Sequence, residues 1–174
     1  MEKLVELNQI ERQLILYDVF TTFEKITYSD IQFIFKKVEK RMLQRDVRDL
    51  MDAGLILVKY SKNEQAYVHV KEENGKITKR ENISKRKMLH LKRLERLAGC
   101  LRLVDNPNPV ESYFEMFPES SERMRQRDFE TLRHIGVEAG YDRLYREYTV
   151  RNDDVGPYDG YGIFIRDGKM VRYL

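Results

Sequence analysis

One helical face of this chain gathers the side chains best suited to bind a base edge or a phosphate. An arginine can make paired hydrogen bonds to guanine or to a phosphate, and a glutamine can bond adenine through one donor and one acceptor. At about 100° per residue, four such side chains share one side of a helix: Arg41, Gln44, Arg45 and Arg48. The opposite side is apolar, with Leu43, Val47 and Leu50. The spacing therefore predicts a helix with one side in a core and the other facing a nucleic acid or only solvent.

The segment that carries this face occurs twice. RMLQRDVRDLMDAGL at residues 41–55 returns as RMRQRDFETLRHIGV at residues 123–137, with seven of fifteen aligned residues identical and an offset of 82. Repetition at a fixed offset predicts two copies of one structural unit. The second copy replaces Arg48 by Glu130 and Leu43 by Arg125. We therefore expect the first copy to bind an anionic partner more strongly.

The elements that would position the first copy follow a simple order. Apolar periodicity predicts a helix over 10–23 and a short helix over 31–35, and residues 26–30 between them are expected to form a loop. Ser29 or Asp30 could cap the short helix. Gly54 should end the repeated helix in a left-handed conformation. Two strand-like runs then form a hairpin, over 55–60 and 66–70.

The same order recurs 82 residues later. Helices are predicted over 85–103 and 110–117, with Ser120 or Ser121 as the N-cap of the second long helix. Strands over 138–141 and 147–150 form a shorter hairpin. Residues 151–174 have no counterpart in the first copy. A hairpin turning at Asp167 and Gly168 is expected there, either extending the second hairpin or meeting another chain.

The predicted fold is α+β and mainly helical. Three helices followed by a β-hairpin wing are the order of a winged helix-turn-helix unit, so two tandem units of this kind are expected. The predicted divisions are 1–82 for the first domain, 83–150 for the second, and 151–174 for a Gly-rich loop and the C-terminal hairpin.

The motif Arg-x-x-Gln-Arg-Asp, with Leu and Gly downstream, resembles the winged-helix DNA-binding segment of DeoR-like and WYL-domain bacterial transcription regulators. The resemblance covers residues 10–70 and 86–150. It implies a sequence-specific regulator of double-stranded DNA whose second long helix enters the major groove. The ligand-sensing domain that usually follows in such regulators has no counterpart here, so no small-molecule effector is assigned. The positions that match the motif are Arg41, Met42, Gln44, Arg45, Arg123, Met124, Gln126 and Arg127.

Basic residues are distributed unevenly along the chain. The formal net charge is +3, yet residues 76–102 hold ten Lys/Arg against two Glu, which suggests a polyanionic partner. The full set predicted to bind DNA is Lys40, Arg41, Met42, Gln44, Arg45, Arg48, Arg123, Met124, Arg125, Gln126 and Arg127. Phosphate contacts are predicted for Lys36, Lys37, Lys62, Lys85, Lys87, Lys92, Arg93 and Arg143.

Two other features are assigned to the scaffold. Asp46 and Asp128 border the apolar side of their helices, and an acid aimed at phosphates would repel them, so a structural salt bridge or helix cap is expected. An apolar stripe within 85–103 is expected to lie in the core, with a short coiled-coil dimer contact as the alternative. The stripe consists of Met88, Leu91, Leu94, Ala98 and Leu101.

Other chemistry has no support in the sequence. His69, His90 and His134 have no neighbours at metal-ligand spacing, and there is no Gly-rich phosphate loop or nucleophile motif. Cys100 lies among apolar residues and is expected to pack rather than react. We therefore expect no enzymatic activity, metal or cofactor.

The location and partners follow from the same reading. No apolar run approaches the roughly 20 residues that span a bilayer, and the N-terminus lacks a signal-peptide core. A cytoplasmic DNA-binding protein without a membrane partner is expected, and a homodimer is left open. The alternative function is a winged-helix protein-interaction module that does not bind DNA.

Overall fold

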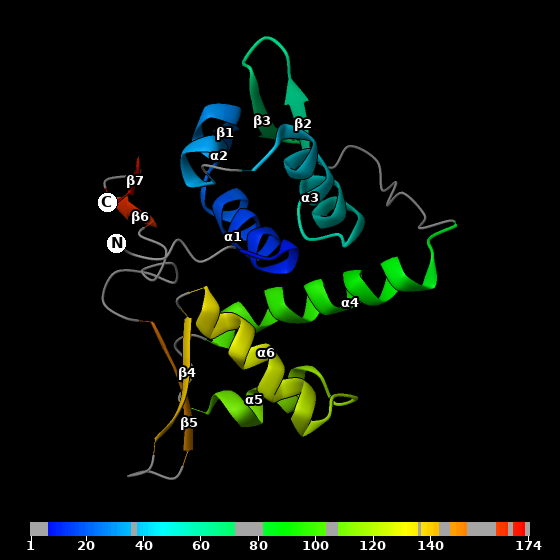
Figure 1. Cartoon of the computed structure of the whole chain (residues 1–174), viewed down its shortest axis with the longest axis vertical. Coiled ribbons are helices and arrows are strands. Elements are labelled where there is room, and N and C mark those ends of the chain that lie inside the picture. Colours follow the sequence, from blue (N-terminus) through cyan, green and yellow to red (C-terminus); the bar gives the residue numbers. More distant parts are fainter. Residues whose placement is uncertain are drawn as a thin grey trace. The chain divides into compact units, whose positions relative to one another are not determined.

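The computed structural model describes residues 7–35, 38–71, 82–103, 108–135, 137–142, 147–152, 163–166 and 169–172. The chain divides into two compact units, each with its own long-range contacts. The first unit is Arg12–Glu95, and the second joins Met1–Glu11 to Arg96–Leu174. The described elements are mainly helical with a small antiparallel sheet, which confirms an α+β fold (Figure 1).

Most of the first unit consists of three helices and a three-stranded sheet. The helices are α1 (Gln9–Thr22), α2 (Tyr28–Ile34) and α3 (Lys40–Asp52). The first three residues of α1 belong to the second unit. The strands are β1 (Lys25–Thr27), β2 (Val58–Ser61) and β3 (Ala66–His69), in the order β1-β3-β2. Tyr67 of β3 lies opposite both Ile26 and Tyr60, and its ring meets Phe20 of α1 edge-on with 5.8 Å between ring centroids.

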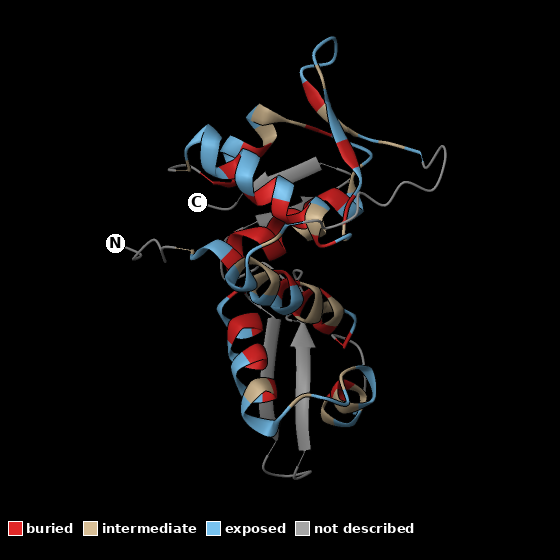
Figure 2. Ribbon diagram, turned by 90° about the vertical axis from the view of Figure 1, so that its right-hand side faces the viewer, coloured by how far each residue is buried: buried red, intermediate tan, exposed pale blue. Residues whose placement is uncertain are grey.

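Apolar burial explains why these helices pack together. The inward side of α1 carries Leu14, Ile15, Val19 and Phe20, all at most 2% exposed. Residues 10–16 of α1 are all buried, whereas buried and exposed residues alternate along α3. Figure 2 maps burial onto the ribbon. Burying one such side chain contributes about 1.5–3 kcal/mol. The core of the first unit is therefore formed mainly by helices, and the sheet adds the buried side chains of Ile26, Val58 and Ala66.

The segment before α2 differs from the prediction. Residues 26–30 were expected to form a loop, with Ser29 or Asp30 as the cap of the short helix after it, but β1 pairs with β3 there and α2 begins at Tyr28. Thr27 is the N-cap: its side chain accepts from the Asp30 N–H at 3.1 Å, while the Asp30 carboxylate accepts from the Thr27 N–H at 2.8 Å. This reciprocal capping box satisfies two free donors at once.

The end of α3 was predicted correctly. Gly54 has a φ of +71°, and its N–H donates to the carbonyl of Met51 at 2.9 Å. The next residue, Leu55, donates to the carbonyl of Leu50 at 3.0 Å. These two bonds form a Schellman motif, which ends the helix through a left-handed residue.

The second unit repeats the order of helices. It contains the last part of α4 (Lys85–Cys100), a 3₁₀ turn over Leu101–Leu103, α5 (Pro109–Met116) and α6 (Glu122–His134). The bounds of α6 lie 82 positions after those of α3, and Ser121 is its N-cap, one of the two serines expected. Strands β4 (Val137–Asp142) and β5 (Glu147–Asn152) form one hairpin, and β6 (Ile163–Arg166) and β7 (Lys169–Arg172) form another.

The division between the units falls within α4, at Glu95 and Arg96, whereas the sequence placed it at residue 82. The first turns of α4 belong to the first unit because Lys87 and His90 bond residues of α1 and α3. Leu91, Leu94 and Ala98 are at most 1% exposed, so this part of the predicted stripe is core and is not left for a coiled-coil contact. None of the described helices is long and apolar enough to cross a bilayer.

Candidate nucleic-acid interface

The outer side of α3 carries a basic surface. Its solvent-exposed residues include Lys40, Arg41, Gln44, Arg45 and Arg48. Within the part of the chain that the structure describes, the last four make no side-chain hydrogen bond or ion pair. Lys40 lies over the ring of Tyr28 at the start of α2, 5.3 Å from its centroid. The donors of this face are therefore available to an external acceptor.

Burial on the inner side fixes the rotation of α3 about its own axis. Leu43, Val47 and Leu50 are at most 3% exposed, as the periodicity predicted. Rotating the helix would bring these side chains into water, at about 1.5–3 kcal/mol for each. The outward direction of the arginines is thus set by the core and not by contacts of their own.

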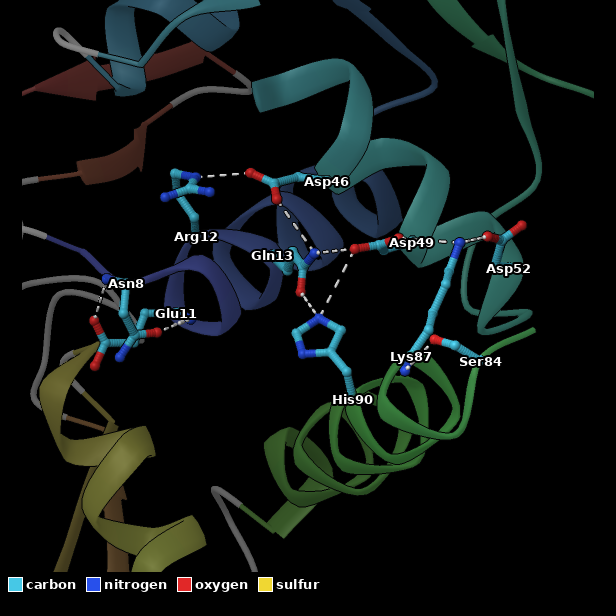
Figure 3. A network of polar contacts seen from close by, with 10 residues as sticks. All are labelled: Asn8, Glu11, Arg12, Gln13, Asp46, Asp49, Asp52, Ser84, Lys87 and His90. Atoms are coloured by element: carbon cyan, nitrogen blue, oxygen red, sulfur yellow. Dashed lines mark hydrogen bonds and ion pairs between the residues drawn. The ribbon is translucent and has the colours of Figure 1, made fainter. Parts of the chain in front are cut away.

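Asp46 holds α3 against α1, in the scaffold role that the sequence assigned to it. Arg12 donates from Nε to the Asp46 carboxylate at 2.7 Å, and Gln13 donates from Nε2 to the other oxygen at 3.2 Å (Figure 3). The Asp46 side chain is 1% exposed. Burial raises the pKa of Asp46, and the bond and charge of Arg12 oppose that shift.

Gln13 links three helices through one carboxamide. Its Nε2 donates to Asp49 at 3.0 Å as well as to Asp46, while its Oε1 lies 2.8 Å from Nε2 of His90 on α4. Because an amide oxygen only accepts, the His90 nitrogen donates in this bond. Figure 3 shows Gln13 between α3 and α4 with all three partners directed at it.

Lys87 completes the contact between α4 and α3. Its ammonium group pairs with Asp52 and lies 3.5 Å from Asp49. The hydrogen bond to Asp52 raises the pKa of Lys87. Lys87 was predicted to contact phosphate, but its charge is already matched by carboxylates within the first unit. It therefore belongs to the scaffold behind the basic face.

In the second unit, α6 exposes a related but less basic surface. Arg123, Gln126, Arg127 and Glu130 are exposed, and Met124 is partly exposed. Gln126 donates to Glu122 at 3.3 Å. The residue of α3 that corresponds to Glu122 is the exposed Lys40. Acids therefore flank the arginine pair of α6 on both sides, and basic residues flank the pair of α3.

Arg125 was predicted to bind DNA, and the structure contradicts that assignment. Its side chain is 1% exposed, forms an ion pair with Glu122 and lies over the ring of Phe129 with 5.0 Å to the centroid. The reason is geometric, since Arg125 stands at the position of the buried Leu43 and so points inward. The repeat itself gave the signal that should have removed Arg125 from the set.

Asp128 has the same role in the second unit as Asp46 in the first. Arg96 on α4 pairs with its carboxylate, and the hydroxyl of Tyr113 on α5 donates to it at 2.7 Å. Asp128 is 1% exposed, and burial raises the pKa of Tyr113. An arginine of the first helix of each unit thus binds the inward aspartate.

The remaining predicted contacts fall into two groups. Lys62 in the loop between β2 and β3 is exposed, as are Lys85, Lys92 and Arg93 on α4. Lys36, Lys37 and Arg143 lie outside the described residues.

Two further kinds of site receive no support. No group of three or more His, Cys, Asp or Glu could hold a metal among the residues described. Cys100 is buried, and burial raises the pKa of its thiol, which disfavours the reactive thiolate.

No protein-family model, curated protein or solved structure matched this chain when it was compared with them.

Proposed function

We propose that the chain is a sequence-specific double-stranded DNA-binding protein, acting as a transcriptional regulator, in which α3 enters the major groove. The observation that carries this proposal is the exposed basic side of α3 opposite a buried, ion-paired side. A helix held in that way presents its donors in a fixed direction, which base readout requires. Each unit would be a winged helix-turn-helix, with α2–α3 and α5–α6 as the helix pairs and β2–β3 and β4–β5 as the wings.

The division of labour within α3 follows from position. A recognition helix uses its N-terminal part for base edges, so Arg41, Gln44 and Arg45 would read bases. Arg48, one turn later, and Lys40 would bind phosphates. Phosphate contacts supply affinity without sequence information, whereas base contacts supply specificity.

The salt dependence of affinity provides the first test. If Lys40 and Arg48 each neutralise one phosphate, the logarithm of the association constant should fall with log salt at a slope of about −1.8. Between 50 and 200 mM salt the affinity would drop roughly 10-fold. Fluorescence anisotropy with labelled duplexes over this range measures that slope.

Substitution provides the second test. Arg45→Ala should weaken binding to a selected duplex by about 1–3 kcal/mol. The control is Arg102→Ala, which removes an exposed arginine outside both long helices and should leave affinity unchanged. Negligible binding by the unmodified chain at every salt concentration would contradict the proposal.

A protein-interaction module is the second candidate function. It is favoured by large apolar side chains exposed on the first unit, with Phe33 50%, Leu57 43% and Tyr60 45% exposed. Scattered apolar side chains are ordinary on protein surfaces, so this observation is the weaker of the two. A folded chain without measurable DNA affinity would favour this function.

A further inference from the structure

The exposed residues that could read bases are the same on both long helices. Arg41, Gln44 and Arg45 of α3 correspond, 82 positions later, to Arg123, Gln126 and Arg127 of α6, and all six are exposed. Because the two helices also begin and end at corresponding positions, each triplet occupies the same turns of its helix. Equal side chains at equal positions present equal patterns of donors and acceptors.

Packing does not account for this identity. The arginines Arg41, Arg45, Arg123 and Arg127 make no side-chain hydrogen bond or ion pair with the described residues. Some positions that pack have changed between the copies, including Leu43 to Arg125 and Val47 to Phe129, whereas the buried Asp46 and Leu50 recur as Asp128 and Leu132. The identical arginines on the outer side are thus not required by packing or by bonds within the fold.

We infer that the two units read the same short base sequence, so that the natural target is a DNA site with two copies of one element. This inference rests on the proposed function. Arginine pairs with guanine and glutamine with adenine in the major groove, so the element contains guanine next to adenine. One recognition helix contacts about three to four base pairs, which sets the length of the element.

The two copies of the element differ in how tightly they are held. On α6, Glu122 and Glu130 stand where α3 has Lys40 and Arg48, and Gln126 is bonded to Glu122. Acidic side chains next to the DNA phosphates lower the affinity for every DNA sequence. They do not alter which base edge an arginine can bind. The site therefore has one strongly bound and one weakly bound copy.

Selection of bound duplexes from a random pool by the full chain tests the inference. The expected result is one element present twice, with a preferred spacing and orientation. Destroying either copy should lower affinity, because tethered binding at two sites can exceed single-site affinity by about 100-fold or more. Destroying the strongly bound copy should lower it further.

Other outcomes overturn the inference in distinguishable ways. Recovery of a single element, or of two unrelated elements, would contradict the shared readout and leave DNA binding by the chain intact. Recovery of no enriched sequence would contradict the proposed function as well. The selection result thus distinguishes a failure of the shared readout from a failure of DNA binding.

Paired substitutions at corresponding positions sharpen the test. Arg45→Ala and Arg127→Ala should each relax the base preference at the same position of the element, in different copies, with losses of about 5- to 150-fold on the matched base. Lys92→Ala on α4 serves as the control and should weaken all duplexes to a similar degree. If Arg127→Ala leaves the selected sequence unchanged in both copies, the inference is wrong.

Discussion

The helices α3 and α6 share their length, their inward aspartate and their outer triplet, yet they differ in charge and in what holds them. Asp46 is bound by Arg12 and Gln13, and Asp128 by Arg96 and Tyr113. The arginines are 84 positions apart, and the repeat offset is 82. The aspartate is thus paired with an arginine in both units, from positions that do not match in the repeat, while the second partner changes from glutamine to tyrosine.

Removing the inward aspartate of either helix should have the largest effect. Asp46→Ala would leave the buried Arg12 without its ion partner, at about 3–5 kcal/mol, and Asp128→Ala would leave the partly buried Arg96 without its partner, at about 3 kcal/mol. Urea unfolding followed by circular dichroism measures the loss. Glu64→Ala is the control, because it breaks an exposed pair with Lys25 and should cost no more than about 1 kcal/mol. A cost below that of the control for either aspartate would break the comparison between the two units.

Exchanging the charges that distinguish the two helices should have the next largest effect. Arg48→Glu should weaken binding to a two-element duplex by about tenfold or more, since it removes one phosphate contact and adds repulsion. Glu130→Arg should strengthen binding. It should also make the slope of the log association constant against log salt more negative by about 0.9, the value for one further phosphate contact. Anisotropy titrations at two salt concentrations measure both changes. Opposite signs are required, and a loss of affinity on Glu130→Arg would show that α6 does not face DNA.

The exit of α3 gives a smaller effect. Gly54 follows the C-cap residue Ala53 and has a positive φ of +71°. A Cβ at Gly54 would meet nothing within 4 Å, so Gly54→Ala should cost only the left-handed penalty of about 1–2 kcal/mol. Gly54→Asn should cost less, because asparagine tolerates this conformation. Thermal unfolding of the two variants checks the order, and equal costs would contradict it.

The pH dependence of stability should show opposite signs for one acid in each unit. Burial raises the pKa of Asp46 above 3.8, so its titration makes the free energy of unfolding fall as pH rises through the window above that value. The hydrogen bond from Arg125 lowers the pKa of Glu122, so its contribution is present above pH 4.5 and is lost as pH falls through the lowered pKa.

Two substitutions separate these contributions. Asp46→Asn should remove the downward component of stability above pH 3.8, and Glu122→Gln should remove the upward component below pH 4.5. Urea unfolding at pH 3 to 7 gives both profiles, with the exposed Glu119→Gln as the matched control. The same sign for both differences would rule out this account.

Periodic features were predictable from the sequence because they depend on local spacing alone. The six helices, the inward side of α3, the scaffold role of Asp46 and the left-handed Gly54 all follow from side-chain type and a period of 3.6 residues. The strand β1 was missed because three residues carry no readable alternation and its pairing with β3 joins positions about 40 apart in the chain.

The polar contacts behind α3 were not predicted for a different reason. Arg12 and Gln13 sit within an apolar helix, and nothing in their own neighbourhood shows that Asp46 and Asp49 will face them. Polar residues on a helix side that is otherwise apolar are the signal that could have pointed to them, since a buried polar group requires a partner. Arg125 was wrongly assigned to DNA binding because it is an arginine, although the repeat aligns it with Leu43 on the apolar side of the helix.

The carboxamide of Gln13 sets a narrow limit on which sequences this unit can accept. It uses two donors toward carboxylates and one acceptor toward His90. Glutamate has the same shape but would turn both donors into acceptors facing two acids, and asparagine falls one methylene short of them. Among the standard side chains only glutamine has both the reach and the polarity. In any collection of variants selected for a folded protein, position 13 should therefore be among the least variable, although it touches no ligand.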